Sequence, residues 1–173
     1  LRDGQTAALD GVPSGLAAMD ANRDGKLDIL VLENAPTEGH PVASGFEPAS
    51  SVIVLHGRGT GFFGARSAFF LGSPAAGLAA ADLDSDGRPD LLAVHANAGA
   101  VSVVWGAEAQ GFEAPSLQPV YSHEAFAAGD FDGDGKIDIA LKGSSILPAG
   151  IVWNAGGGGL ARRSEIPYSF IDD

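Results

Sequence analysis

The sequence predicts an all-β chain built from repeated units of four antiparallel strands, and three observations lead to this prediction. An acidic nine-residue segment occurs three times in the 173 residues, at 20–28, 82–90 and 130–138. Each copy runs into a short apolar segment rich in Leu, Ile and Val, which is typical of a buried strand. The copies are separated by 62 and 48 residues. A period of about 40–50 residues with four short strands is typical of a β-propeller blade.

The repeats divide the chain in order. Residues 1–14 are expected to form the outer or closing strand of a preceding blade. Three blade repeats follow at 15–76, 77–125 and 126–173, the last with the start of a fourth near its end. The first repeat is longer by an insertion within 33–51, which is rich in Pro, Gly, Ser and Glu and is interpreted as a surface loop. Such a loop is either a tolerated insertion or part of a binding face.

Four strands are expected in each repeat. A short strand enters each acidic loop, and three more follow it before the next repeat begins. The strands that follow the loops are predicted at 27–32, 52–55 and 67–71, at 89–94, 101–105 and 116–120, and at 137–141 and 150–153. Because closed propellers have typically four to eight blades, about three blades do not close alone. The sequence leaves open a fragment, an open arc or a ring completed by other chains.

The charge distribution favours bound cations. The net charge is −12, and eleven Asp, half of the 22 acidic residues, lie in the three loops. Such concentration suggests neutralisation by a cation and excludes nucleic acid as a partner, because nucleic acid requires a basic surface. The chain has no cysteine, which excludes disulfides and thiolate zinc sites. No apolar run approaches the roughly 20 residues of a membrane span.

The acidic loops carry alternating oxygen donors, as a hard cation such as calcium requires. Counted from the first Asp, positions 1, 3, 5 and 9 are expected to donate side-chain oxygens, and position 7 its backbone carbonyl with its side chain in solvent. Gly25, Gly87 and Gly135 at position 6 permit the turn. The predicted ligands are Asp20, Asn22, Asp24, Lys26 and Asp28; Asp82, Asp84, Asp86, Arg88 and Asp90; and Asp130, Asp132, Asp134, Lys136 and Asp138.

Three Ca²⁺ sites are therefore expected, and the first is expected to be the weakest because Asn22 replaces an Asp. The EF-hand shares the first half of this pattern but requires Glu at position 12. Here position 12 is Val31, Ala93 or Leu141, and a strand-like segment follows each loop, so the EF-hand is excluded.

The repeat unit, AAGDFDGDGKIDIAL with VVWGAEAQGFEAPS, resembles the FG-GAP/VCBS family, which is found in integrin α-subunit propellers and bacterial extracellular proteins. The resemblance covers roughly residues 15–164. The calcium loop matches in all three copies, whereas the segments GFEAPS, FFGARS and GLARRS match the eponymous FG-GAP segment less well. The resemblance implies part of a seven-bladed ring, a calcium loop between the first two strands of each blade, and an extracellular or cell-surface location.

The sequence shows no catalytic residue, and an enzyme is the less favoured interpretation. Trp105 and Trp153 occupy equivalent positions, with His56 as their counterpart; they are expected to pack between blades or to form a sugar-stacking platform. The preferred function is a non-catalytic adhesion or recognition scaffold that binds a protein or glycan at the cell surface. The alternatives are a carbohydrate-binding or polysaccharide-processing propeller, and an assembly module that completes a propeller or filament with other chains.

Overall fold

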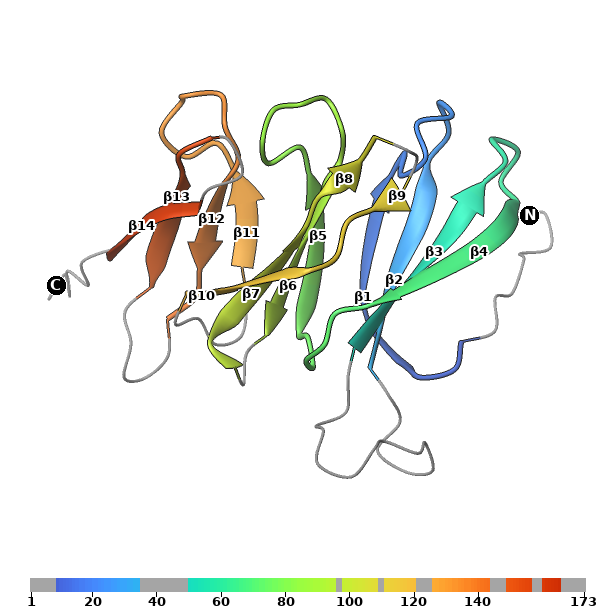
Figure 1. The fold of residues 1–173 in the computed structure, drawn as a ribbon, viewed down its shortest axis with the longest axis horizontal. Helices are drawn as coiled ribbons and strands as arrows, with labels where there is room; N and C mark the ends of the chain where they lie inside the picture. The colour runs from blue at the N-terminus through green and yellow to red at the C-terminus, as the bar shows by residue number, and fades with distance from the viewer. Residues whose placement is uncertain are drawn as a thin grey trace, which may run out of the picture.

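A computed structural model describes residues 9–34, 50–95, 98–108, 111–120, 126–143, 149–156 and 160–165. These residues form three four-stranded antiparallel sheets and a two-stranded ribbon, and none of them lies in an α-helix (Figure 1). The all-β prediction is therefore confirmed. Residues 1–8, most of the predicted insertion at 33–51 and the end of the chain after residue 165 lie outside the described residues.

The first sheet follows the chain in the order β1-β2-β3-β4. Its strands are β1 (Val12–Met19), β2 (Asp28–Asn34), β3 (Ser50–Gly57) and β4 (Phe63–Phe70). The alternating apolar side chains of β2 and β3 are buried on both faces, as in a sheet with neighbours on each side. The first strand begins at Val12, before residue 15, where the first repeat was expected to start.

The second and third sheets repeat this arrangement, with orders β10-β7-β6-β5 and β11-β12-β13-β14. The second contains β5 (Gly77–Ala81), β6 (Asp90–His95), β7 (Ala100–Val104) and β10 (Ser116–Pro119). The ribbon pairs β8 (Gly106–Ala107) with β9 (Gly111–Phe112). The third contains β11 (Phe126–Gly129), β12 (Asp138–Leu141), β13 (Gly150–Asn154) and β14 (Leu160–Glu165).

The sheets stand side by side in chain order (Figure 1). An apolar core fills each of the two spaces between them. In the first space, Leu30 and Val54 belong to the same cluster as Leu91 and Val104 of the next sheet. In the second space, Leu92 and Val103 join Ile139, Leu141 and Val152. Because side chains alternate between the faces of a strand, the second sheet supplies one face to each core.

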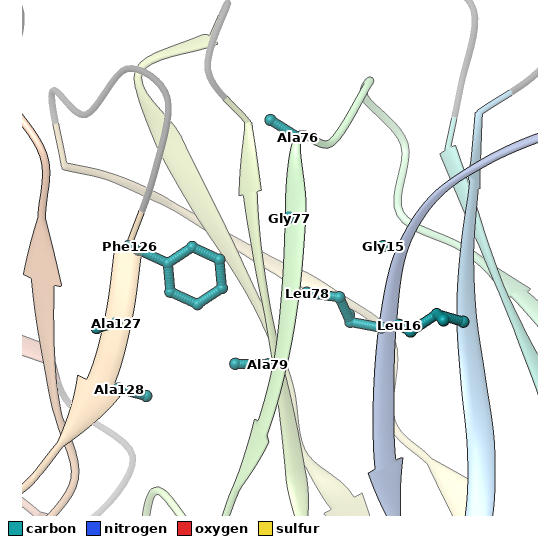
Figure 2. Close-up of a pocket in the computed structure, with 9 residues that line it drawn as sticks. All are labelled: Gly15, Leu16, Ala76, Gly77, Leu78, Ala79, Phe126, Ala127 and Ala128. Atoms are coloured by element: carbon teal, nitrogen blue, oxygen red, sulfur yellow. The ribbon is translucent and has the colours of Figure 1, made fainter.

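The inner strands β1, β5 and β11 of the three sheets lie next to one another. Figure 2 shows the pocket that they line, with a volume of about 340 Å³. Small residues such as Gly15, Ala79 and Ala127 form most of its wall, and the ring of Phe126 lies in it beside Gly77. A Cβ atom at Gly77 would come within 2.9 Å of that ring, which explains why glycine suits this position. The pocket is lined by uncharged side chains, so it offers no acid–base chemistry.

The three acidic loops connect the first and second strands of their sheets, and they all lie along the same edge of the molecule (Figure 1). None of the described residues forms a helix that is long and apolar enough to cross a membrane.

Candidate metal centres in the repeated acidic loops

The carboxylate at position 1 fixes the turn of each loop. Asp82 accepts hydrogen bonds from the amides of Asp86 and Gly87 through its two oxygens, at 3.1 and 3.0 Å. Asp20 binds the equivalent amides at 2.9 and 2.7 Å, and Asp130 does so at 3.1 and 3.0 Å. The three loops therefore share one backbone conformation, although the intervening residues differ.

Two further carboxylate contacts tighten the second loop. Oδ1 of Asp84 accepts from the Asp86 amide at 3.2 Å, and Oδ1 of Asp86 accepts from the Arg88 amide at 2.7 Å. Equivalent bonds occur in the first and third loops. Short polar side chains that bind amides two residues later stabilise turns without a regular strand or helix. The sequence pattern places acidic residues here, and the structure shows that they organise the backbone.

Each loop contains two residues with positive φ, whereas sequence reasoning identified only the glycine at position 6. That glycine has φ of 81°, 79° and 85° in the three loops. Position 4 is also left-handed, with φ of 56° at Arg23, 63° at Ser85 and 79° at Gly133. This conformation is uncommon for residues other than glycine. The glycine at position 4 of the third loop, Gly133, is the one sequence signal that could have predicted the left-handed conformation at this position.

Carboxylates converge in the second and third loops. One oxygen from each of Asp82, Asp84 and Asp86 lies within 4.8 Å of the others. The third loop brings Asp130, Asp132 and Asp138 together in the same way. Within the described residues, the first loop forms no such group of three, and it carries Asn22 at position 3. In each of these two loops, three of the predicted ligands are thus close enough together to bind one cation.

The electrostatics of these loops favour a bound cation. Burial raises the pKa of the Asp84 carboxyl, and the neighbouring charges of Asp86 and Asp82 raise it further. Both causes reflect the cost of holding a negative charge close to other negative charges and away from water. A cation removes that cost, and a site made of oxygen donors suits a hard ion such as Ca²⁺. The residues present therefore fit calcium.

The basic side chains at position 7 lie at the surface, 41%, 26% and 33% exposed in the three loops, and each also pairs with the Asp at position 5, which the sequence did not predict. Lys26 forms an ion pair with Asp24 at 2.9 Å, and Lys136 pairs with Asp134 in the same way. Arg88 pairs with Asp86 and also donates from Nε to the carbonyl of Gly106 at 2.9 Å. The ion pairs form at the surface because the turn brings positions 5 and 7 to the same side of the loop. The Lys136 hydrogen bond lowers the pKa of Asp134, and the same contact raises the pKa of Lys136.

The aspartate at position 9 connects its loop to a part of the chain that is distant in sequence. Asp90 is fully buried, and its two oxygens accept from the amides of Leu83 and Gly106, each at 2.7 Å. Leu83 is at position 2 of the loop, and Gly106 directly follows β7 and Trp105. Burial raises the pKa of Asp90. The sequence predicts Asp90 only as a metal ligand and does not indicate its contact with Gly106, which lies just after β7.

The same connection occurs in the other two sheets. Asp28 accepts from the amides of Ala21 at 3.1 Å and Gly57 at 2.7 Å. Asp138 accepts from the amides of Phe131 at 3.0 Å and Asn154 at 2.9 Å. Each sheet therefore has a buried carboxylate that ties position 2 of the loop to the end of the third strand.

Gly57 makes a testable contribution to this connection. A Cβ atom at this position would lie 2.0 Å from the backbone oxygen of Leu27, so Gly57→Ala must displace the amide that binds Asp28. We expect this substitution to lower the free energy of unfolding by about 1–3 kcal/mol, as overpacking does in a tight interior. Urea unfolding would measure the loss.

Gly64→Ala is the matched control for this measurement. A Cβ atom at Gly64 would meet only the flexible side chain of Arg58, which can move away. We expect its unfolding free energy to stay near that of the wild type. Equal stability of the two variants would show that the Gly57 contact does not hold the loop.

His56, Trp105 and Trp153, which occupy equivalent positions in the three repeats, are all partly buried. Trp105 is half-buried and packs against the core between the second and third sheets. Trp153, its equivalent, is also half-buried. His56 lies 3.3 Å from Asp28 through Nδ1 and 3.2 Å from Ser67 through Nε2.

The three four-stranded antiparallel sheets and their repeated loops are consistent with partial β-propeller blades. A family model described as an FG-GAP-like repeat matches residues 82–141, from the second acidic loop to the end of β12. This stretch is about a third of the chain, and over it the chain carries an FG-GAP-like repeat, as the sequence resemblance indicated. Searches of curated proteins and of solved structures found no match.

Proposed function

We propose that the chain is a calcium-binding β-propeller module that acts outside the cell as a non-catalytic scaffold for adhesion or recognition. One observation carries the proposal: loops with the same internal hydrogen bonds lie on the same edge of every sheet, and two of them gather three carboxylates within 4.8 Å. Acidic side chains so close together repel one another unless a cation lies among them. The repeat of this arrangement supports a common role in all three sheets.

The ions would be held by the side-chain oxygens at positions 1, 3 and 5 and by the backbone carbonyl at position 7. The buried aspartate at position 9 can take part without losing its amide contacts, because each carboxylate oxygen has two lone pairs. In the second loop these residues are Asp82, Asp84, Asp86, Arg88 and Asp90. When bound, calcium supplies positive charge that neutralises the loop and stabilises its closed turn.

The resemblance to secreted and cell-surface repeats supports the proposed extracellular role. Extracellular calcium modules bind with dissociation constants of about 10⁻⁴–10⁻³ M, which suits shallow and partly exposed loops such as these. The partner would be a protein or a glycan at the cell surface. A carboxylate that holds calcium is a poor general acid, because the cation keeps it ionised, and this supports a non-catalytic role.

A carbohydrate-binding function is less well supported. A stacking platform requires an accessible aromatic face, but Trp105 packs against the core between two sheets. A glycan-binding screen, with tryptophan fluorescence recorded on sugar addition, would separate the two functions. Sugar-dependent quenching that disappears in a Trp153→Ala variant would support the carbohydrate-binding alternative.

Calcium titration by calorimetry tests the proposed sites. We expect the second and third loops to bind more tightly than the first, because Asn22 contributes no charge where Asp84 and Asp132 each contribute one. Asn22→Asp should therefore raise the affinity of the first loop, whereas Asp84→Asn should weaken the second by a similar factor. Equal affinity at all three loops of the wild type would count against this account.

A further inference from the structure

Asn154 is a buried polar residue that contacts two of the acidic loops. It is the last residue of β13 in the third sheet, and it is 5% exposed. Its Nδ2 atom donates to the carbonyl of Leu83, which is at position 2 of the second loop. The same nitrogen donates to the carbonyl of Ile137, at position 8 of the third loop, at 3.1 Å. One side chain therefore joins loops that belong to neighbouring sheets.

The other hydrogen bonds of Asn154 fix its orientation. Its backbone amide donates to Oδ1 of Asp138 at 2.9 Å, and its own Oδ1 accepts from the amide of Gly156 at 2.9 Å. The side-chain nitrogen thus faces two carbonyl oxygens, and the side-chain oxygen faces an amide, which is the arrangement that satisfies both groups. A flipped amide would lose these bonds in a buried place, where an unsatisfied polar group is costly.

Leu83 is held on both sides of its backbone. Its side chain is 1% exposed and belongs to the core between the second and third sheets. Its amide donates to Asp90 at 2.7 Å, and its carbonyl accepts from Asn154. A continuous series of hydrogen bonds thus joins Asp90 to Asp138, the buried aspartates at position 9 of the second and third loops.

The first two sheets have no side chain in the place of Asn154. Gly57 and Gly106 occupy the equivalent position, and each donates its amide to the aspartate at position 9 of its own loop, as Asn154 does. A Cβ atom at these glycines would lie 2.0 and 2.8 Å from a backbone oxygen. The first loop contacts the second sheet through an exposed bond from Arg23 to the carbonyl of Glu108 at 3.3 Å. The buried connection is thus specific to the second and third loops.

We propose that Asn154 couples these two loops, so that calcium bound at one of them raises the affinity of the other. The inference rests on the proposed function, because it concerns the same metal sites. Leu83 lies between two predicted ligands, so its carbonyl is held in place for Asn154 when the second loop is occupied. Asn154 then holds Ile137 and Asp138, and less ordering of the third loop remains to be done on binding. Linkage between two binding sites is reciprocal, so the effect also runs from the third loop to the second.

Nuclear magnetic resonance of the ¹⁵N-labelled chain can follow each loop separately, because the glycine amide at position 6 reports on its own loop. The signals of Gly87 and Gly135 would be recorded during a calcium titration. Asp84→Asn with Asp86→Asn removes two converging charges from the second loop and keeps side-chain oxygens that accept backbone amides. We expect this double substitution to raise the calcium concentration that half-saturates the Gly135 signal by about fivefold or more, as is typical of coupled sites.

Asn154→Gly should remove this dependence on the second loop. It introduces the residue that the first two sheets have at the same position, so the fold accommodates it. In the Asn154→Gly background, the double substitution should leave the Gly135 midpoint nearly unchanged. Long-range charge effects are present in both backgrounds and cancel in this comparison. Asn154→Ala, which keeps a Cβ atom in β13, should give the same result.

Asn34→Ala is the matched control. Nδ2 of Asn34 also donates to a backbone carbonyl, that of Ala75, at 3.3 Å. Asn34 ends β2, however, and so lies at the end of the strand opposite the acidic loop. This variant should keep the full effect of the second-loop substitutions on the Gly135 signal.

Hydrogen exchange in chelator tests the contact without calcium. The amide of Leu83 should exchange faster in Asn154→Gly than in the wild type, because the loop has lost its connection to the third sheet. The amide of Ala21, at position 2 of the first loop, should exchange at the same rate in both proteins. Equal exchange of Leu83 in the two proteins would show that Asn154 does not hold the second loop.

The outcomes of the titration separate this inference from the proposed function. Calcium binding at both loops, with a Gly135 midpoint that ignores the second-loop substitutions, would overturn the inference alone. A linkage that persists in Asn154→Gly would also overturn it, even if both loops bound more weakly, because Asn154 would then only stabilise the fold. A wild type that binds no calcium at either loop would overturn the proposed function as well.

Discussion

Replacing Asp90 with alanine is expected to lower the free energy of unfolding by about 2–4 kcal/mol, whether or not calcium is present. The substitution leaves the amides of Leu83 and Gly106 without their buried acceptor. Each unsatisfied buried donor costs about 1–3 kcal/mol. Burial of the Asp90 carboxylate is itself costly, and this cost raises its pKa in the folded protein. Because the substitution removes that cost as well, the net loss is smaller than the sum for the two unsatisfied amides.

Urea unfolding in the presence of a chelator would measure this loss. Asp86→Ala is the matched control, because Asp86 is exposed and its carboxylate serves the loop and the candidate metal site. We expect Asp86→Ala to change the stability of the calcium-free protein by less than about 1 kcal/mol, as is usual for exposed sites. If Asp90→Ala were as stable as the wild type in chelator, the buried carboxylate would not hold the loop to the third strand.

The contrast between Asp86 and Asp90 shows what the sequence can and cannot predict. The repeat of acidic segments and the apolar runs after them predicted the strands β2, β6 and β12 and the loops that precede them. Those features depend on residues close together in the chain, where spacing determines which side chains share a face. The all-β fold could therefore be predicted from local pattern and from the repeat.

The role of position 9 could not be predicted in the same way. Its contact with the third strand joins Asp90 to Gly106, and the equivalent contact joins Asp28 to Gly57 across a gap of 29 residues. Only the pairing of the second and third strands brings these groups together. The ion pairs of position 7 also depend on a turn with two left-handed residues, one of which is Ser85, a residue that rarely adopts this conformation.

The largest expected effect is that of calcium on thermal stability. A ligand that binds only the folded state at 100 times its dissociation constant stabilises that state by about 2.7 kcal/mol for each site. For a chain of this size, 1 kcal/mol corresponds to about 2–4 °C in melting temperature. We therefore expect chelation to lower the melting temperature by roughly 5–10 °C for each occupied loop.

A double variant provides the matched control. Asp84→Asn with Asp132→Asn removes one carboxylate from each of the two groups that converge within 4.8 Å, and it leaves the buried residues at position 9 unchanged. In chelator this variant should melt near the wild-type temperature or slightly above it, because like charges have been removed from each loop. In calcium it should lose most of the increase that the wild type gains.

The most direct test of the calcium sites is differential scanning calorimetry of the wild-type chain, first in saturating calcium and then after chelation. The proposal predicts a melting temperature that falls by several degrees for each ion removed and recovers when calcium is restored. A melting temperature that is the same in calcium and in chelator would contradict the proposal that these loops hold calcium.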